Sequence, residues 1–274
     1  MNVVPLMLYA AAALAYGRHF ARRSAGAGRA ATMLLMAGAL AHTFIIGMQT
    51  VTSGHIPVAG ASPAVSTFVW LLALAYLYTE VTTGERAMGV FILPLIVVMQ
   101  AIPALHPGHE DQAAVLHSPW FGVHVSSLLF AYASFALACV IGVTYMLLFK
   151  EIKAKHLGVF YERLPSLQVL DVMNRRAVVV GWIFLTVGII VGTIWAAQAR
   201  IIDPTDPRVQ AMSLGDPKIF AALVCWAVYS FEVVALHMSG WSGRRTAWLS
   251  IIGFVIVLVN LVPISYFLTT SHTF

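Results

Sequence analysis

Long apolar runs dominate the chain, and short polar stretches separate them. The eight runs lie at roughly residues 2–17, 30–51, 64–82, 87–105, 120–149, 177–199, 219–238 and 246–270. Each is near the ~20 residues that an α-helix needs to cross ~30 Å of hydrocarbon. The runs are continuous rather than alternating, which favours helices over the strands of a membrane barrel. The pattern predicts an all-α, polytopic integral membrane protein with about eight transmembrane helices, and we expect the first run to be retained rather than cleaved.

The composition agrees with a chain that is solvated by lipid. It is 60% hydrophobic and 10% charged over 274 residues, whereas a soluble domain carries about a quarter charged residues. We therefore expect one membrane domain, in which residues 1–119 form an N-terminal four-helix part and residues 120–274 a C-terminal one.

The basic residues are distributed unevenly between the two sets of loops. The loops that follow the odd-numbered runs hold Arg18, Arg22, Arg23, Arg29, Arg86, Lys150, Lys153, Lys155, Arg163, Arg175, Arg176, Arg244 and Arg245. Only Arg200, Arg208 and Lys218 lie on the other side. Because basic loops stay in the cytoplasm, both termini are predicted on the outer (periplasmic or extracellular) side of the cytoplasmic membrane. The net charge of +5 is thus a topology signal, and we expect no nucleic-acid partner.

The inner segment 150–176 is long enough to hold a further short helix. Pro165 suits a first helical turn, and Leu167, Leu170 and Met173 recur behind it at three-residue spacing. The flanking basic residues favour an amphipathic connector that lies on anionic headgroups.

Two acidic residues fall within predicted spans, where a charge is costly. Glu80 is near the inner end of the third span, from which its side chain can reach the interface. Glu232 is well inside the seventh span, one helical turn from Tyr229. Glu232 is either a carboxyl group satisfied by a neighbouring helix or a site for a proton or a cation.

Most of the ten histidines lie at the outer face or within spans. His124 begins the fifth span and His272 ends the eighth, at the same predicted depth. Neutral imidazole is a good ligand for haem iron, so packing could place the two rings on either side of one flat cofactor. The alternative is two interfacial histidines that hydrogen-bond to water or backbone.

The other histidines divide between the membrane interior and the outer loops. His42 is midway along the second span, and His237 is near the inner end of the seventh. His55, His106, His109 and His117 lie in outer loops. His106 and His109, followed by Glu110 and Asp111, resemble a metal-binding loop, but Pro107 and Gly108 make the segment a turn rather than a helical face.

Four stretches of the second half, in this order, resemble the cytochrome c assembly family, which includes CcsA-type and HemX-like haem-handling membrane proteins. Residues 124–135 read His-Val-Ser-Ser-Leu-Leu-Phe-Ala-Tyr-Ala-Ser-Phe. Residues 164–171 read Leu-Pro-Ser-Leu-Gln-Val-Leu-Asp and lead to Gly-Thr-Ile-Trp-Ala at 192–196. Asp-Pro-Lys at 216–218 precedes Trp226 and Tyr229. Gly-Trp-Ser-Gly-Arg-Arg at 240–245 precedes the terminal Ser-His-Thr-Phe.

The resemblance implies a protein that holds non-covalent haem b at its outer face for cytochrome c biogenesis. His124 and His272 match the two outer histidines of the family and would be the axial ligands of the haem iron. His237 stands near the place of a histidine in the penultimate helix of the family, and we pair it with His42. The implied partners are haem, an apocytochrome c and a second cytochrome c assembly membrane protein.

The chain departs from the family in its tryptophan-rich haem-binding stretch, whose form is W-G-x-x-W-x-W-D-P-K. The corresponding segment begins at Trp195 and ends with Asp216, Pro217 and Lys218, but the intervening tryptophans are missing. The remaining residues, Trp195, Asp216 and Lys218, join the expected cofactor-binding set, with Lys218 and Arg200 placed to pair with haem propionates. The missing rings favour a divergent or accessory member, closer to the HemX-like branch.

The leading hypothesis is therefore a haem-handling assembly factor rather than a turnover enzyme. A small-solute or proton-coupled transporter is the alternative, with Glu232, His42 and His237 as its polar path. A regulatory or scaffolding membrane subunit without haem is the third interpretation. The three differ in where the critical residues lie, at the outer rim or in the middle of the membrane.

Overall fold

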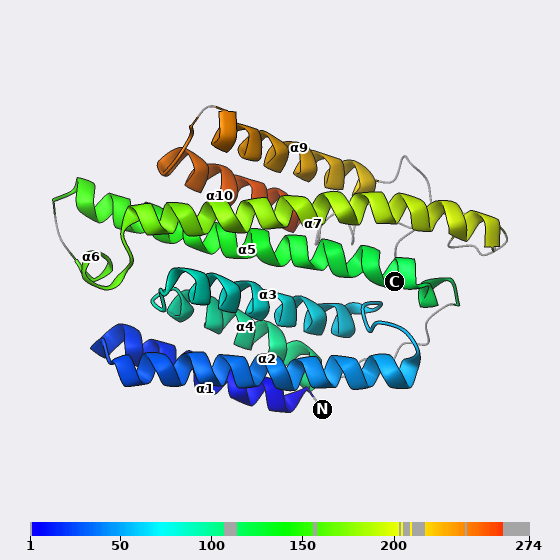
Figure 1. Cartoon of the computed structure of the whole chain (residues 1–274), viewed down its shortest axis with the longest axis horizontal. Coiled ribbons are helices and arrows are strands. Elements are labelled where there is room, and N and C mark those ends of the chain that lie inside the picture. The colour runs from blue at the N-terminus through cyan, green and yellow to red at the C-terminus, as the bar shows by residue number, and fades with distance from the viewer. Residues whose placement is uncertain are drawn as a thin grey trace.

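The computed structural model describes residues 2–106, 114–155, 158–202, 204, 209, 217–238 and 240–259, and within these ranges all regular structure is helical. The long helices lie side by side along one direction, and successive helices run in opposite directions (Figure 1). The chain is thus all-α. At one end of the bundle lie the connections after α1, α3, α5 and α9, which carry the basic residues. We call this end the inner end and the opposite one the outer end, after the charge-based prediction.

The first four long helices pack on one another. They are α1 (Val3–Arg22), α2 (Ala25–Ser53), α3 (Ala61–Thr83) and α4 (Gly89–Leu105). Helix α1 contacts α2 and α4, and α3 closes the group by contacting the same two helices. Local sequence sets the turns between them: the Ser24 hydroxyl caps α2 by accepting from the Ala27 N–H at 3.3 Å, and Gly84 ends α3 in the left-handed conformation.

The second group is built around α5. Its elements are a 3₁₀ turn η1 (Ala114–His117), α5 (Pro119–Lys153), α6 (Val159–Arg163), α7 (Leu167–Ile202), α9 (Pro217–Met238) and α10 (Arg244–Val259). Helix α5 contacts α7 and α10 within this group and α3 of the first group (Figure 1). The division of the chain into halves at residues 119 and 120 remains a prediction.

Each of the eight predicted spans corresponds to one long helix, and five are long and apolar enough to cross a membrane: α2, α3, α5, α7 and α9. The others fall short for separate reasons. Helix α1 carries Arg18 and Arg22 in its last two turns, α4 has 17 residues, and α10 is described for 16 residues. The chain is a multi-pass membrane protein, and its total of eight spans stays a prediction.

The predicted connector helix at the inner face is wrong. Leu167, Leu170 and Met173 are instead the first turns of α7, which continues without a break to Ile202. Leu170 and Met173 are fully buried in the main core, so their three-residue spacing marks a face that packs on protein rather than on headgroups.

Glu80 does not reach the interface either, because the first three helices enclose it. Its carboxylate accepts hydrogen bonds from the Tyr16 hydroxyl and the Thr32 hydroxyl, both at 2.5 Å. The Arg86 guanidinium lies 3.6 Å from the same carboxylate, and Glu80 is only 2% exposed. Glu80 therefore joins α1, α2, α3 and the turn before α4 at the inner end.

Close backbone approach at Gly142 should be essential for the packing of α5 on α10. A Cβ at this position would lie 2.9 Å from the backbone oxygen of Ala247, which cannot rotate away. We expect Gly142→Ala to cost about 1–3 kcal/mol of stability, the usual cost of overpacking. Thermal unfolding in detergent measures it, with Gly47→Ala as control because nothing lies within 4 Å of a Cβ there. Equal unfolding temperatures for the two variants would contradict the expectation.

Candidate functional site

His124 lies one turn and a half into α5, at the outer end of the bundle, and a hydrogen bond to α7 orients its ring. The Nδ1 atom is 2.7 Å from the backbone oxygen of Gly188. A carbonyl oxygen can only accept, so Nδ1 carries the proton and donates. In a neutral ring Nε2 is then the acceptor nitrogen, which is the arrangement found in most metal-ligating histidines.

Two glycines of α7 make room for this ring. A Cβ at Gly192 would lie 2.4 Å from Cε1 of His124, and a Cβ at Gly188 would lie 2.7 Å from Leu128. Further along the same seam, a Cβ at Gly181 would meet the ring of Phe135 at 2.5 Å. The small residues let α7 approach α5 closely enough for a backbone carbonyl to accept from the imidazole.

Trp195 lies beside His124 in an apolar cluster at the same end. Its ring is nearly parallel to the imidazole, with 17° between the planes and 6.2 Å between the centroids. Phe121 contacts the other rings of the cluster, 5.0 Å from Trp195. The buried members come from four different segments: Val58, Ala59, Leu116, Phe121 and Trp195. Trp195 Nε1 is buried without a hydrogen-bond partner among the described residues, so one N–H donor of this cluster is unsatisfied.

A pair of outer-loop histidines lies at the same end. The rings of His55 and His117 stack with their centroids 4.4 Å apart and 16° between their planes. No group of three histidine, cysteine or acidic side chains that could hold a metal ion is found within the described ranges. His106 directly follows α4, whereas His109, Glu110 and Asp111 of the candidate metal loop lie outside the described residues.

Several predicted site residues lie in parts of the chain that the structure does not describe. His272 and Asp216 are among them. Lys218 is the second residue of α9, which places its backbone at the outer end of that helix. The structure therefore brings His124 and Trp195 together, and the position of His272 relative to them stays a prediction.

The structure does not bring His42 and His237 together. His42 is fully buried in α2, where Nδ1 lies 3.3 Å from the Tyr9 hydroxyl and Nε2 lies 2.9 Å from the Ser66 hydroxyl. His237 is exposed near the inner end of α9, and its Nδ1 donates to the Val233 oxygen at 2.8 Å. Helix α2 packs on α1 and α3, whereas α9 packs on α7 and α10 (Figure 1).

Glu232 is fully buried at the contact of α9 and α10. Its Oε1 atom is 2.7 Å from the Ser250 hydroxyl, which is also 3.1 Å from Oδ1 of Asn174. The Asn174 amide nitrogen donates to the Ala138 oxygen at 2.9 Å, which fixes the orientation of that amide. Glu232 Oε2 has no partner among the described residues.

Comparison with known proteins decides the family. A family model described as cytochrome C assembly protein matches residues 5–272. The chain belongs to the cytochrome c assembly protein family. The match includes the first four helices, which the sequence motifs alone related to the family only in general pattern.

Curated members of the family align over most of the chain at low identity. The cytochrome c biogenesis protein CcsA of Guillardia theta is 24% identical over 252 residues, which cover 85% of this chain and 81% of that protein. The CcsA of Chlorella vulgaris is 27% identical over 245 residues (77% and 75%). The CcsA of Prochlorococcus marinus strain MIT 9303 is 25% identical over 282 residues (92% and 86%). This cytochrome c assembly family member is thus a distant homologue of these proteins.

Sequence reasoning found His124 but missed what orients it. The signal was present, since Gly181, Gly188 and Gly192 are spaced by seven and four residues and so lie on one face of α7. Small residues at such spacing are typical of close helix contacts in membranes. The carbonyl of Gly188 could not be found in the same way, because every residue carries one.

Proposed function

We propose that the chain holds haem at its outer end for cytochrome c biogenesis, with His124 as one axial ligand of the iron and His272 as the other. The observation that carries the proposal is the hydrogen bond from His124 Nδ1 to the Gly188 oxygen at 2.7 Å. This bond assigns the proton to Nδ1 and so makes Nε2 the nitrogen that would bind iron, while it also holds the plane of the ring.

The residues next to His124 suit a flat, apolar and dianionic group. The Trp195 ring offers an apolar surface nearly parallel to the imidazole, and its unsatisfied Nε1–H is a donor for a carboxylate. Lys218 and Asp216 are proposed to complete the site from the start of α9, where the lysine would pair with a propionate.

This chain would bind and orient haem rather than turn over a substrate. Bound haem would supply the iron and the porphyrin that a c-type cytochrome receives. The residues of the chain would hold it: the histidines by ligation, Trp195 by contact with the ring, and the apolar residues around Phe121 by excluding water. The proposed partners are an apocytochrome c and a second assembly membrane protein, and only with such a partner would attachment follow.

The proposed site requires a particular topology. With both termini on the outer side of the cytoplasmic membrane, His272 lies on the same face as His124 and the start of α9. The positions of the basic residues support this orientation.

The proposal is tested by the absorbance spectrum of the full-length protein purified in detergent, before and after addition of haem. We expect a Soret band typical of six-coordinate iron with two histidine ligands. A protein that stays colourless with excess haem would refute the proposal and would favour a scaffolding subunit.

The buried Glu232 favours proton-coupled transport as a second candidate function. The Ser250 hydroxyl has one hydrogen but lies within hydrogen-bond distance of two oxygens, Asn174 Oδ1 and Glu232 Oε1. A protonated Glu232 resolves this, because its O–H donates to Ser250 and Ser250 then donates to Asn174. The path is restricted to this cluster, since His42 and His237 lie on other helices or other faces.

A neutral amide should therefore replace Glu232 without loss of stability. We expect Glu232→Gln to unfold within about 0.5 kcal/mol of wild type, because its N–H₂ donates to Ser250 as the acid does, whereas Glu232→Ala should cost about 1–3 kcal/mol. Infrared spectroscopy should show a protonated carboxyl stretch in wild type that Glu232→Gln lacks. A wild-type spectrum without that band would show that Glu232 is ionised, and transport unaffected by Glu232→Gln would exclude the second function.

A further inference from the structure

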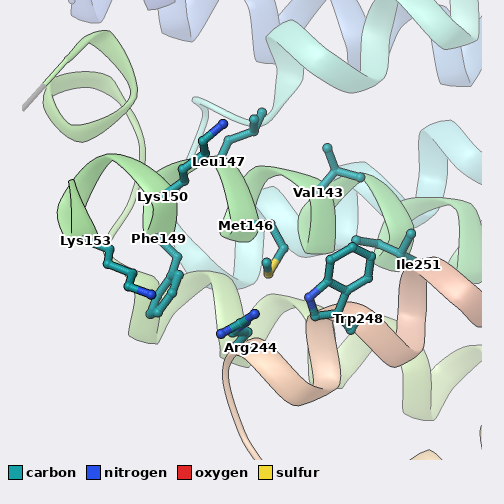
Figure 2. Close-up of a pocket in the computed structure, with 9 residues that line it drawn as sticks. All are labelled: Val143, Met146, Leu147, Phe149, Lys150, Lys153, Arg244, Trp248 and Ile251. Atoms are coloured by element: carbon teal, nitrogen blue, oxygen red, sulfur yellow. The ribbon is translucent and has the colours of Figure 1, made fainter. Parts of the chain in front are cut away.

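A groove opens between the inner ends of α5 and α10, far from His124 (Figure 2). It has a volume of about 470 Å³. Its apolar lining comprises Val143, Met146, Leu147, Phe149, Trp248 and Ile251. His124 precedes Met146 by 22 positions on the same helix, which corresponds to roughly 33 Å at 1.5 Å per residue. The groove is therefore separate from the proposed haem site.

The lining changes from apolar to basic toward the inner end. Along α5, Val143 and Leu147 are followed by Lys150 and Lys153, which lie on the same side of the helix as the groove. Arg244 begins α10 across from them, and Figure 2 shows its guanidinium close to Phe149. The guanidinium carbon lies 5.8 Å from the centroid of the Phe149 ring. An apolar groove with cations at its inner rim matches acyl chains below an anionic headgroup.

None of the three rim cations is neutralised within the described part of the chain. The ion pairs found there join Arg86 to Glu80 and Arg175 to Asp171. No acidic residue lines the groove. The rim thus presents uncompensated positive charge at the depth where phosphate groups lie.

A second hollow shares the same arginine and extends the basic rim. It lies next to the groove and is lined by Trp241, Arg244, Arg245 and Trp248, among others. The Arg245 guanidinium lies 5.2 Å from the Trp241 ring centroid. Tryptophan and arginine in this combination are typical of the membrane–water interface, where the indole ring remains at headgroup level.

We propose that this groove is a specific binding site for an anionic phospholipid of the inner leaflet. The phosphate lies among Lys150, Lys153 and Arg244, and an acyl chain lies along the apolar wall that ends at Trp248. The charge complementarity distinguishes this occupant from a zwitterionic lipid, which carries its own ammonium group against the rim.

The test compares lipids that remain bound to the full-length protein in native mass spectrometry from detergent. We expect phosphatidylglycerol to be retained in preference to phosphatidylcholine. Lys150→Gln/Lys153→Gln should weaken phosphatidylglycerol binding about twenty-five-fold, since each lysine near an anionic lipid is worth a factor of about five. Arg244→Gln alone should weaken it about fivefold.

The matched control is Arg22→Gln/Arg23→Gln, which removes two cations from the same end of the bundle but away from the groove. We expect this variant to retain phosphatidylglycerol as wild type does. An equal loss in the control would show general attraction to a basic face and would overturn the site. Equal retention of phosphatidylcholine, or displacement of the lipid by haem, would overturn it as well. The haem spectrum should be unchanged in the lysine variant, so a failure of either proposal is recognised separately.

Discussion

Replacing His124 with alanine should abolish tight haem binding by this chain. The substitution removes the proposed iron ligand and leaves the Gly188 carbonyl without its imidazole donor. Even the loss of an outer-shell partner usually costs 10–100-fold in metal affinity, so we expect the loss of the ligand itself to exceed about 100-fold. Haem titration followed by absorbance measures the dissociation constant, and the six-coordinate spectrum should be replaced by a five-coordinate one or disappear.

Two further variants show whether such a loss arises from ligation. Gly192→Ala keeps the histidine but places a Cβ 2.4 Å from its ring, so it should weaken haem binding about 10–100-fold by moving the ligand. His55→Ala removes another histidine from the same end and should leave the spectrum unchanged. An unaltered spectrum in His124→Ala would refute the assignment of this residue, and an equal effect of His55→Ala would move the ligand to the stacked pair.

Removing the Glu80 carboxylate should destabilise the protein more than any other substitution considered. Glu80→Ala leaves the buried Tyr16 and Thr32 hydroxyls without their acceptor and Arg86 without its counter-charge. Breaking a buried charged pair from one side typically costs about 3–5 kcal/mol. Because Arg86 is partly exposed, we expect about 3 kcal/mol, measured by thermal unfolding in detergent.

The controls for this prediction separate the charge from the shape. Glu80→Gln retains one oxygen acceptor and should lose about half as much stability. Glu162→Ala removes an exposed carboxylate from α6 at the same end and should change stability by no more than about 0.5 kcal/mol. If Glu80→Ala unfolds at the wild-type temperature, the four-residue contact contributes nothing to the joint between α1, α2 and α3.

The sequence predicted the helices well because lipid demands a strong and simple pattern. A continuous apolar run of the right length has few alternatives in a membrane, so each predicted span coincides with a helix. The error at the start of α7 arose where this pattern weakens. Leu170 and Met173 follow a basic loop and resemble an interfacial face, yet α5 buries them. Apolar spacing indicates that a face is covered, but it does not say whether lipid or protein covers it.

The candidate site was predictable in part for a similar reason. A histidine that heads an apolar span is visible in the sequence, and so His124 was found. Its tautomer depends on the Gly188 carbonyl, 64 residues further along the chain, which no local pattern indicates. The same limit applies to Glu80, whose partner Thr32 lies 48 residues earlier and on another helix. Depth in the membrane alone predicted the wrong environment for this carboxylate.

The glycine seam of α7 has a consequence for how this protein can diverge. Positions 124 and 192 occupy one shared volume, since no side chain fits at 192 while the imidazole is in place. A lineage that abandons the histidine releases the constraint on the glycine, and a lineage that keeps it cannot change the glycine first. Among divergent relatives, the residue opposite the ring is therefore a record of whether the ring is still in use.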